Sequence, residues 1–261
     1  MPELPEVEEA MLRLRAAVEG KTIASAEALH PAIERQFPAA TARRLRGQQI
    51  VSVERRGKHQ LLHLANGSTI HAHFRMNGDW IISTADAARD KFARATIDLS
   101  DGTRIELKDS RALAALSVHP KGENPLPDLG IEANDDALDA AYLKSALAKR
   151  RGPIKPTLLD QRVIAGLGNM YAAEALWRAR ISPRARSSSI AKARLERLAT
   201  SIHAVLDEEN RPPGRYSEQE GRHRFGVYDR EGEACARCGS TVKRIQQAGR
   251  STSYCPGCQR S

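Results

Sequence analysis

All four cysteines of this 261-residue chain lie within its last 27 residues, in the segment CARCGSTVKRIQQAGRSTSYCPGC. Each C-x-x-C pair presents two thiolates on a tight turn, and two pairs complete the tetrahedral four-thiolate site that Zn²⁺ favours. Four protein ligands leave no open position for a catalytic water, so the spacing predicts one structural zinc ion. A redox pair or two disulfides would be the alternative. The ligands would be Cys235, Cys238, Cys255 and Cys258.

The segment between the two cysteine pairs is a predicted β-hairpin with strands STVKRIQQ and RSTSYC and a turn at Ala248 and Gly249. It carries Lys243, Arg244 and Arg250, and Arg250 directly follows the turn. An arginine on a tip stiffened by metal can reach phosphates or a DNA groove. The alternative is an ordinary solvated face.

The charge of the chain favours a polyanionic partner. The net charge is +9 with a pI of about 9.6, and residues 211–261 supply +5 of it. Such a surface suits nucleic acid, although charge implies nothing about the fold. Mean hydropathy is −0.50 and no apolar run approaches the ~20 residues that span a bilayer. With no secretory signal pattern at the start, we expect no membrane association and a cytoplasmic, nucleoid-associated location.

Residues 4–21, LPEVEEAMLRLRAAVEGK, form a predicted helix. Pro5 suits an early helical position and Gly20 suits the end of the helix. The apolar residues that recur at helical spacing are Val7, Met11, Leu14 and Val18.

From about residue 22 to 118 the pattern changes to short runs with rough alternation, which predicts strands. The sequences NG, NGD and SDGT between them are turn signals. This part is therefore expected to be a mainly antiparallel β domain, a sandwich or a barrel. The runs are QQIVSVERR, HQLLHLA, STIHAHF, DWIIST, RATIDLS and TRIELKD.

Residues 119–136, rich in Pro, Gly and acids, are interpreted as a linker into a second, helical part. Its helical patterns are DALDAAYLKSALAKR, KPTLLDQ, NMYAAEALWRAR and SIAKARLERLATSIHAVLDEE, and a polar stretch then leads to the cysteines. The predicted fold class is α+β. We expect a β domain over 1–130, a helical domain over 131–220 and a zinc finger over 221–261.

A glycine-rich turn precedes one of these helices, in LLDQRVIAGLGNMYAAEALW. Gly166 and Gly168 permit close backbone approach, and Asn169 can cap the helix, whose first amides could bind a phosphate. Two helices joined by a compact turn commonly dock on DNA, but a capped hairpin in a core would look the same. Lys155, shortly before, adds positive charge here or is simply solvated.

Three motifs in this order resemble the formamidopyrimidine-DNA glycosylase/endonuclease VIII family: PELPEVE at the start, DQRVIAGLGNMYAAEALW, and CARCGSTVKRIQQAGRSTSYCPGCQ at the end. The resemblance extends over the full chain. It implies an N-terminal β-sandwich domain preceded by a helix, and a C-terminal domain with a helix-two-turn-helix and a zinc finger. It also implies a monomer that binds damaged double-stranded DNA in a cleft and flips the damaged nucleotide out.

The resemblance also implies roles for individual residues. The nucleophile would be Pro2, freed by removal of Met1. Glu3 and Glu6 match the motif's glutamates, and Lys58 in ERRGKHQLL matches the β-domain lysine. The DNA contacts would be Met76, which fills the void, Arg111, which faces the orphaned base, the phosphate-binding Asn169 and the zinc-finger Arg250.

The chemistry explains why a terminal proline is needed. An amine that displaces a base leaves a Schiff base, which activates the sugar for strand cleavage. An α-amino pKa of ~8 leaves a usable neutral fraction near pH 7, and the positive helix end and nearby basic residues would lower it further. Glu3 is placed to protonate the sugar and shuttle protons, and Glu6 to orient the terminus. Lys58 would hold a phosphate or donate to the displaced base. The expected outcome is β,δ-elimination.

Without the family resemblance, the more usual interpretation of Met76 is a core residue, and that of Arg111 is a solvated charge. Two departures bear on lesion preference. Leu113 stands where members directed at 8-oxoguanine usually carry a phenylalanine wedge, and leucine stacks poorly on bases. Members directed at 8-oxoguanine also have a run of residues that closes over the flipped purine like a lid, and the segment NRPPGRYSEQEGRHRF lacks it. The endonuclease VIII branch, which prefers oxidised pyrimidines, is similar in lacking this run. We therefore expect relaxed lesion specificity.

The leading hypothesis is a bifunctional DNA glycosylase and AP lyase that removes oxidised purines or pyrimidines through Pro2. A second is a DNA-binding relative that recognises lesions or abasic sites without processing them. A third is a zinc-ribbon protein that binds nucleic acid or a partner and has no role at lesions. With Met1 attached, the Pro2 nitrogen is an amide and cannot attack, so the first hypothesis requires that Met1 be removed.

Overall fold

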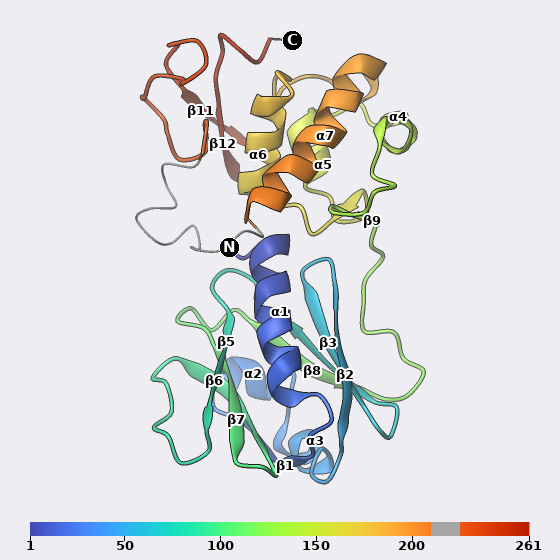
Figure 1. Ribbon diagram of the computed structural model, residues 1–261, viewed down its shortest axis with the longest axis vertical. Coiled ribbons are helices and arrows are strands. Elements are labelled where there is room, and N and C mark those ends of the chain that lie inside the picture. Colours follow the sequence, from blue (N-terminus) through green and yellow to red (C-terminus); the bar gives the residue numbers. More distant parts are fainter. Residues whose placement is uncertain (210–224, 261) are drawn as a thin grey trace. The chain divides into compact units, whose positions relative to one another are not determined.

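The computed structural model describes residues 1–209 and 225–260 (Figure 1). The chain divides into two compact units, Met1–Pro127 and Asp128–Ser261. In the described residues no helix combines the length and the apolar composition needed to cross a bilayer.

The first unit begins with helix α1 (Leu4–Val18), which matches the predicted helix. Pro5 lies in its first turn, and Gly20 adopts φ +78° just beyond its end, a conformation that glycine accepts without steric cost. The predicted apolar stripe faces inward: Val7, Met11, Leu14 and Val18 are all at most 3% exposed. Burial of each such side chain contributes ~1.5–3 kcal/mol, which holds α1 on the sheets.

Two four-stranded antiparallel sheets make up the β part of this unit, and this confirms the predicted sandwich (Figure 1). One sheet has the order β1-β6-β7-β5 and the other β2-β3-β4-β8. The first comprises β1 (Ile23–Ala28), β6 (Ala93–Leu99), β7 (Thr103–Lys108) and β5 (Asp79–Thr84). The second comprises β2 (Ile50–Arg56), β3 (His59–Leu64), β4 (Thr69–His73) and β8 (Ala115–His119).

Two short helices interrupt the predicted run of strands: α2 (Pro31–Glu34) and α3 (Ala39–Arg44). They carry Ile33 and Ala42 into the core that α1 and both sheets share. The alternation pattern did not reveal them, because each spans little more than one helical turn.

The second unit is mainly helical. It contains α4 (Ala140–Leu147), α5 (Ile154–Leu158), α6 (Asn169–Arg178), the 3₁₀ turn η1 (Ser187–Ser189) and α7 (Lys192–Glu209). The two-residue strands β9 (Ile131–Glu132) and β10 (Ile164–Ala165) pair in parallel, so part of the predicted linker is built into this unit.

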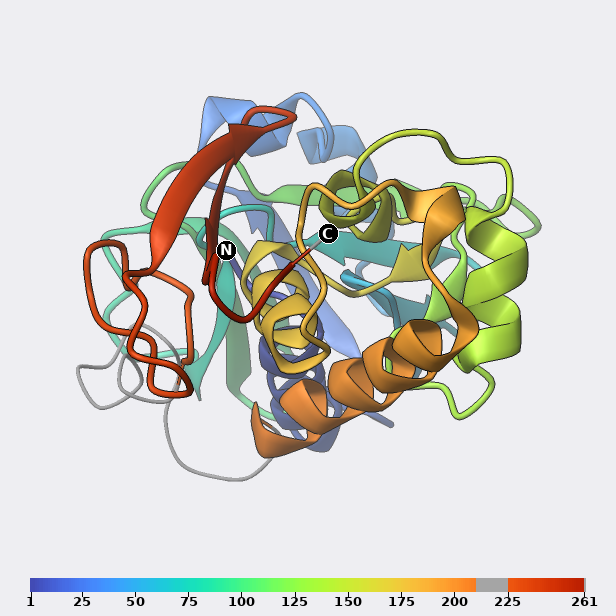
Figure 2. The same ribbon diagram turned by 90° about the horizontal axis from the view of Figure 1, so that it is seen from above.

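The predicted cysteine hairpin is present as β11 (Lys243–Gln247) and β12 (Arg250–Tyr254). Figure 2 shows α6 beside α7 and beside this hairpin. Ala248 and Gly249 form the turn with φ +48° and +74°, the left-handed pair that a two-residue hairpin turn requires.

Candidate active site and metal centre

The two glutamates of the N-terminal motif are paired with each other at the start of α1. The Glu3 amide donates to Glu6 Oε2 over 2.8 Å, and the Glu3 carboxylate accepts the Glu6 amide. This reciprocal capping box satisfies two amides that a helix start would otherwise leave unpaired. Glu3 is only 2% exposed, whereas Met1 is 44% exposed. The chain therefore enters α1 along one defined path, with Pro2 next to a buried carboxyl group.

Lys58 lies in the β2–β3 turn and is largely buried, at 7% exposure. The neighbouring Arg55 forms an ion pair with Glu8 of α1 and donates to the Gly57 carbonyl over 3.0 Å. Arg55 thus connects α1 to the turn that carries Lys58. Local sequence patterns do not reveal this connection, because Glu8 and Arg55 are 47 residues apart.

Four histidines form a cluster on the second sheet, next to this turn. His59 Nδ1 and His71 Nε2 are 2.8 Å apart, the His59 and His73 rings meet edge to face at 4.6 Å, and the His119 ring lies 6.0 Å from that of His71. Cross-strand register explains the cluster: His59 is paired with His73, and His71 with Ser117, two residues before His119. No motif in the sequence marks any of these residues.

Three members of the histidine cluster, His59, His71 and His73, have pKa values well below the usual range. Burial, assisted by the charge of Arg75, lowers the pKa of His59 to about 4. Burial and the neighbouring histidines lower the pKa of His71 to about 4, and burial with the charges around it lowers that of His73 to about 3. The His73 Nδ1 accepts the Arg75 amide over 2.9 Å, so its ring proton is on Nε2.

Met76 and Leu113 are exposed apolar side chains at the tips of two loops, at 39% and 47%. The exposure of Met76 excludes the alternative of a core methionine. The loops are joined by a hydrogen bond from the Asn77 side-chain amide to Ser110 Oγ, over 2.6 Å. An exposed pair of apolar side chains on linked loops is suited to insertion between bases.

A fully buried acid holds the loop that carries Arg111. One Asp109 carboxylate oxygen accepts the Arg111 amide over 2.9 Å, and the other accepts the amides of Leu113 and Ala114 over 2.6 and 2.7 Å. These bonds support Ala112 in the left-handed conformation, φ +51°, which costs a non-glycine residue ~1–2 kcal/mol. Asp109 is thus a positioning residue for this loop, which no sequence motif indicates.

In the second unit, Lys155 is an internal brace. It is 1% exposed, and its ammonium group donates to Asn169 Oδ1 over 2.5 Å, to the Ser251 carbonyl over 3.1 Å and to Thr252 Oγ1 over 2.9 Å. A lysine has three N–H donors, and three protein acceptors surround them. The alternative of a solvated lysine is therefore excluded, and Lys155 ties α5, α6 and β12 together.

The predicted helix cap at Asn169 is wrong. Gly168 occupies the N-cap position of α6 and Asn169 is the first helical residue. The Asn169 carboxamide instead accepts from Lys155 and donates to the Ser251 carbonyl over 3.1 Å. Because both ends of its side chain are engaged away from the helix start, no oxygen is left to cap it. Arg250, the first residue of β12, is exposed at the tip of the hairpin.

The four cysteine sulfurs lie within 4.8 Å of one another, which fits a metal centre. The Sγ atoms of Cys235 and Cys258 are 3.9 Å apart, and those of Cys238 and Cys255 are 3.4 Å apart. A tetrahedral zinc with Zn–S bonds of ~2.3 Å needs sulfurs about 3.8 Å apart. The donor set and its spacing therefore fit one structural zinc, as predicted, and contain no disulfide.

A buried acid anchors the segment that leads into this centre. The Glu174 carboxylate, on α6, accepts the amides of Gly226, Val227 and Tyr228 over 2.8, 2.9 and 2.8 Å. Burial raises the pKa of Glu174 although these three bonds oppose the rise. Gly226 packs so closely on the Trp177 ring that a Cβ would lie 2.3 Å from it.

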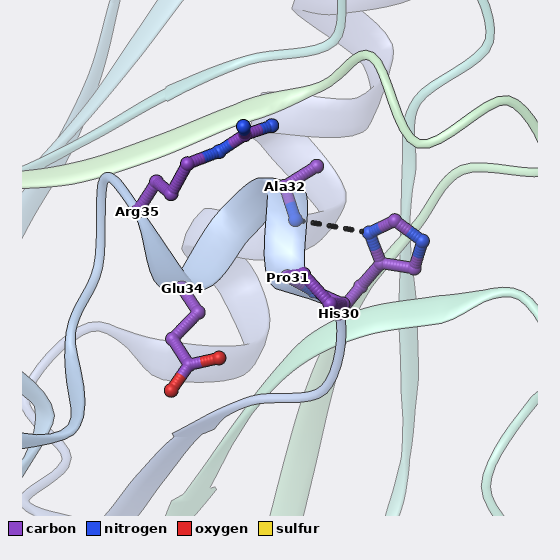
Figure 3. Close-up of a pocket in the computed structure, with 5 residues that line it drawn as sticks. All are labelled: His30, Pro31, Ala32, Glu34 and Arg35. Atoms are coloured by element: carbon purple, nitrogen blue, oxygen red, sulfur yellow. Dashed lines mark hydrogen bonds between the residues drawn. The ribbon is translucent and has the colours of Figure 1, made fainter.

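One cavity of about 410 Å³ lies at α2 and contains none of the predicted site residues. Figure 3 shows its lining, in which His30 Nδ1 accepts the Ala32 amide over 3.1 Å. That bond caps a four-residue helix. We therefore attribute the cavity to the packing of this short helix and assign it no function.

Comparisons with known proteins follow the same division of the chain. The model of the formamidopyrimidine-DNA glycosylase N-terminal domain matches residues 1–116, that of the H2TH domain of the same enzyme matches 129–211, and that of a zinc finger found in FPG and IleRS matches 232–260. The helix-two-turn-helix and the zinc finger are thus confirmed.

Two similar curated proteins are formamidopyrimidine-DNA glycosylases from Chelativorans sp. and Ruegeria pomeroyi, each 38% identical with the whole of both chains covered. A solved MutM in complex with DNA containing carbocyclic 8-oxo-G matches with a TM-score of 0.91, 30% identity and full coverage of both chains. A Lactococcus lactis Fpg with Fapy-dG DNA matches with a TM-score of 0.90 and 30% identity, over 99% of this chain and 100% of that one. The chain therefore belongs to the formamidopyrimidine-DNA glycosylase family.

Proposed function

We propose that the protein is a bifunctional DNA glycosylase and AP lyase of base excision repair, acting on double-stranded DNA with oxidised bases or abasic sites. The observation that carries the proposal is the buried Glu3 carboxyl beside Pro2, held in place by the reciprocal bonds with Glu6. Solved relatives support the substrate class: MutM was bound to 8-oxo-G DNA, and the Lactococcus lactis enzyme to abasic and Fapy-dG DNA.

The reaction begins once Met1 has been removed, because a free proline terminus is a secondary amine. Its nitrogen attacks the sugar C1′ and loses its proton, the C1′–base bond breaks, and the base leaves with a proton. The ring oxygen then takes up a proton as the C1′–O4′ bond breaks, which opens the sugar and leaves C1′ double-bonded to the Pro2 nitrogen. The resulting Schiff base acidifies the C2′ hydrogen, so successive β- and δ-elimination break the strand on both sides of the sugar. Water then releases Pro2.

Glu3 is the candidate proton carrier of this sequence. A carboxyl next to the amine can protonate the sugar ring oxygen as the base departs and can accept protons during elimination. Lys58, in its largely buried turn, is proposed to hold a phosphate beside the lesion or to donate to the leaving base. Glu6 keeps the Glu3 backbone in place rather than acting on substrate.

The DNA contacts are proposed on both units. Met76 fills the space left by the flipped nucleotide, Arg111 faces the orphaned base, and Leu113 packs beside it. These contacts would offset the few kcal/mol that flipping costs. Asn169 and Arg250 bind phosphates, and Lys155 supports them from within. A zinc ion at the four cysteines supplies structural rigidity to the hairpin that presents Arg250.

The lesion preference is proposed to be broad. Leu113 provides bulk without an aromatic face, and the polar stretch that lacks a lid-like run lies mainly in 210–224, outside the described residues.

Three further statements are part of this proposal. The protein is a monomer, it is located in the cytoplasm with the nucleoid, and its domains are 1–130, 131–220 and 221–261. The unit boundary after Pro127 is compatible with the first of these domain limits.

The experiment is borohydride trapping. Protein whose mass shows loss of Met1 is incubated with duplexes carrying an abasic site, 8-oxoguanine, formamidopyrimidine or 5-hydroxyuracil. We expect a covalent adduct with the abasic duplex and with several lesions. It should vanish in protein that retains Met1, in which the Pro2 nitrogen is an amide.

Two glutamate variants refine the test. Glu3→Gln should lower the rate of base excision at least 10²-fold, while Glu9→Gln, on the exposed face of α1, should leave it unchanged. Tight binding of all four duplexes without any adduct would instead establish the DNA-binding relative that processes nothing.

A further inference from the structure

We propose that an arginine-lined cavity behind the zinc centre is a second DNA-phosphate site, separate from the lesion site. The cavity has a volume of about 480 Å³ and lies where the end of α6, the start of α7 and the two cysteine turns meet. Its lining residues are Arg180, Arg194, Arg197, Arg237, Cys238, Gly257, Cys258 and Arg260. The inference rests on the proposed function, since it takes DNA to be the natural polyanion of this protein.

The charge of the cavity is unbalanced. Five guanidinium groups line it, no carboxylate does, and none of the five forms an ion pair with an acid in the part of the chain that the structure describes. A zinc ion with four thiolates would carry a net charge of −2, so about three positive charges would remain. Because a hollow lined by one sign of charge attracts ligands of the opposite sign, this excess favours an anionic ligand.

The guanidinium groups are held in place by carbonyl oxygens. Arg194 donates to the Arg260 carbonyl over 3.1 Å and Arg260 to the Gly257 carbonyl over 3.2 Å. Arg237 donates to the Trp177 carbonyl over 2.9 Å while its guanidinium lies 4.1 Å from the centre of the Trp177 ring. Each of these bonds uses one of five N–H donors, so most donors stay available to a phosphate in a fixed arrangement.

Arg180 occupies a position that favours glycine. It follows the end of α6 with φ +57°, and its amide and that of Ile181 donate back to the carbonyls of Trp177 and Leu176 over 3.1 and 2.9 Å. Such a helix end is ordinarily occupied by glycine, because a side chain in this conformation is strained. The chain thus keeps an arginine at the cavity at a cost in stability, as sites under functional constraint do.

Arg194 and Arg197 lie near the start of α7, whose first turn contains no acid. Cations at a helix N-terminus oppose the helix dipole. Two arginines three residues apart share one helix face, and with Arg180 they line one wall of the cavity. A bound phosphate would remove both the mutual repulsion and the unfavourable dipole interaction.

The cavity is distinct from the proposed contacts at Asn169 and Arg250. Asn169 is at the beginning of α6 and Arg180 lies past its end, so ten residues of helix, about 15 Å, separate them. The guanidinium groups come from four segments and form an array wider than one free phosphate needs. Since guanidinium forks match phosphate oxygens, the occupant we infer is the backbone of a second, undamaged duplex segment.

The test is a titration with an undamaged 12-bp duplex at low salt, followed by native mass spectrometry. We expect two duplexes on the unsubstituted chain and one on R180G/R194Q/R197Q. R180G alone should weaken the second duplex at least fivefold while raising the melting temperature by about 2–4 °C, because glycine relieves the strain. A loss of binding in that variant therefore cannot come from unfolding. R44Q, at an exposed position of α3, removes one positive charge as R180G does. It is the matched control for R180G and should keep both duplexes.

Three outcomes would overturn the inference. A triple variant that still binds two duplexes places the second site elsewhere, and an unsubstituted chain that binds only one duplex has no second site. Sodium tripolyphosphate bound without a second duplex would assign the cavity to a free polyphosphate. Borohydride trapping tests the proposed function independently. If no adduct forms but the second duplex still binds, the proposed lyase activity is refuted and the second phosphate site is supported.

Discussion

The Lys155 ammonium group donates to the Asn169 side-chain oxygen over 2.5 Å while it also reaches Ser251 and Thr252 of the cysteine hairpin. One buried cation thereby fixes the start of α6 and the beginning of β12 relative to each other. Because Asn169 and Arg250 are the proposed phosphate contacts of this unit, Lys155 determines whether the two can act together.

Replacement of this cation should cost stability. Lys155→Met removes a buried charge and its three hydrogen bonds, so we expect a loss of about 2–4 kcal/mol in the free energy of unfolding, measured by urea denaturation. Lys144→Met, at an exposed position of α4, should change it by less than ~0.5 kcal/mol. Equal stabilities of the two variants would show that the three bonds contribute nothing.

Asp109 should control the loop of Arg111. Asp109→Asn keeps the volume but replaces one acceptor oxygen by an NH₂ group, which faces backbone amides. We expect a loss of about 1–3 kcal/mol in stability and weaker binding of lesion duplexes. Asp136→Asn, an exposed acid in the second unit, is the control. If Asp109→Asn lowered stability without any change in the affinity for lesion duplexes, the loop would have no part in recognition.

Zinc removal should loosen the hairpin of Arg250. We expect one zinc per chain by atomic absorption, and after chelation fast amide exchange in β11 and β12 with at least a tenfold loss of DNA affinity. Addition of Zn²⁺ should restore both. Cys238→Ser should reproduce the chelated state in zinc-containing buffer. Retention of slow exchange after the metal has gone would contradict a structural role.

The histidine cluster should make the protein less stable in acid. The pKa values of His59 and His71, both about 4, and of His73, about 3, lie below the unfolded value near 6.5. The unfolded chain therefore binds more protons, and stability is complete above pH 6.5 and declines as the pH falls toward 4.

This decline can be measured by thermal unfolding at half-unit steps of pH. The slope between pH 6.5 and 4 should be shallower in His71→Gln, because one of the neutral histidines is gone. Other groups titrate in the same window, so the comparison is between the slopes of the two proteins. Parallel curves for the variant and the unsubstituted protein would refute the assignment.

Arg250 should contribute to DNA affinity irrespective of sequence. Arg250→Ala is expected to weaken binding of all duplexes and to reduce the slope of log K against log[salt] by about 0.9, the amount for one phosphate contact. Arg244→Ala, in the same hairpin, removes an arginine that is paired with Glu231 over 2.8 Å and should change the slope less. Equal slopes in Arg250→Ala and the unsubstituted protein would exclude a phosphate contact.

Local sequence was sufficient for the elements whose residues interact at short range. The apolar spacing of Val7, Met11 and Leu14 predicted α1, the turn residues Ala248 and Gly249 predicted the hairpin, and the cysteine spacing predicted the metal centre. In each case one helical period, one turn conformation or one coordination geometry relates residues that are close in the chain.

Tertiary structure was needed wherever a residue acts through a distant partner. Lys155 looked like a surface charge, but it is buried because α5, α6 and β12 converge on it, and Asn169 does not cap its helix for the same reason. The histidine cluster depends on strand register, and the arginine cavity on four separate segments packing together. Neighbours along the chain determine local conformation, whereas burial and charge depend on which distant segments pack together, and no short-range pattern records that.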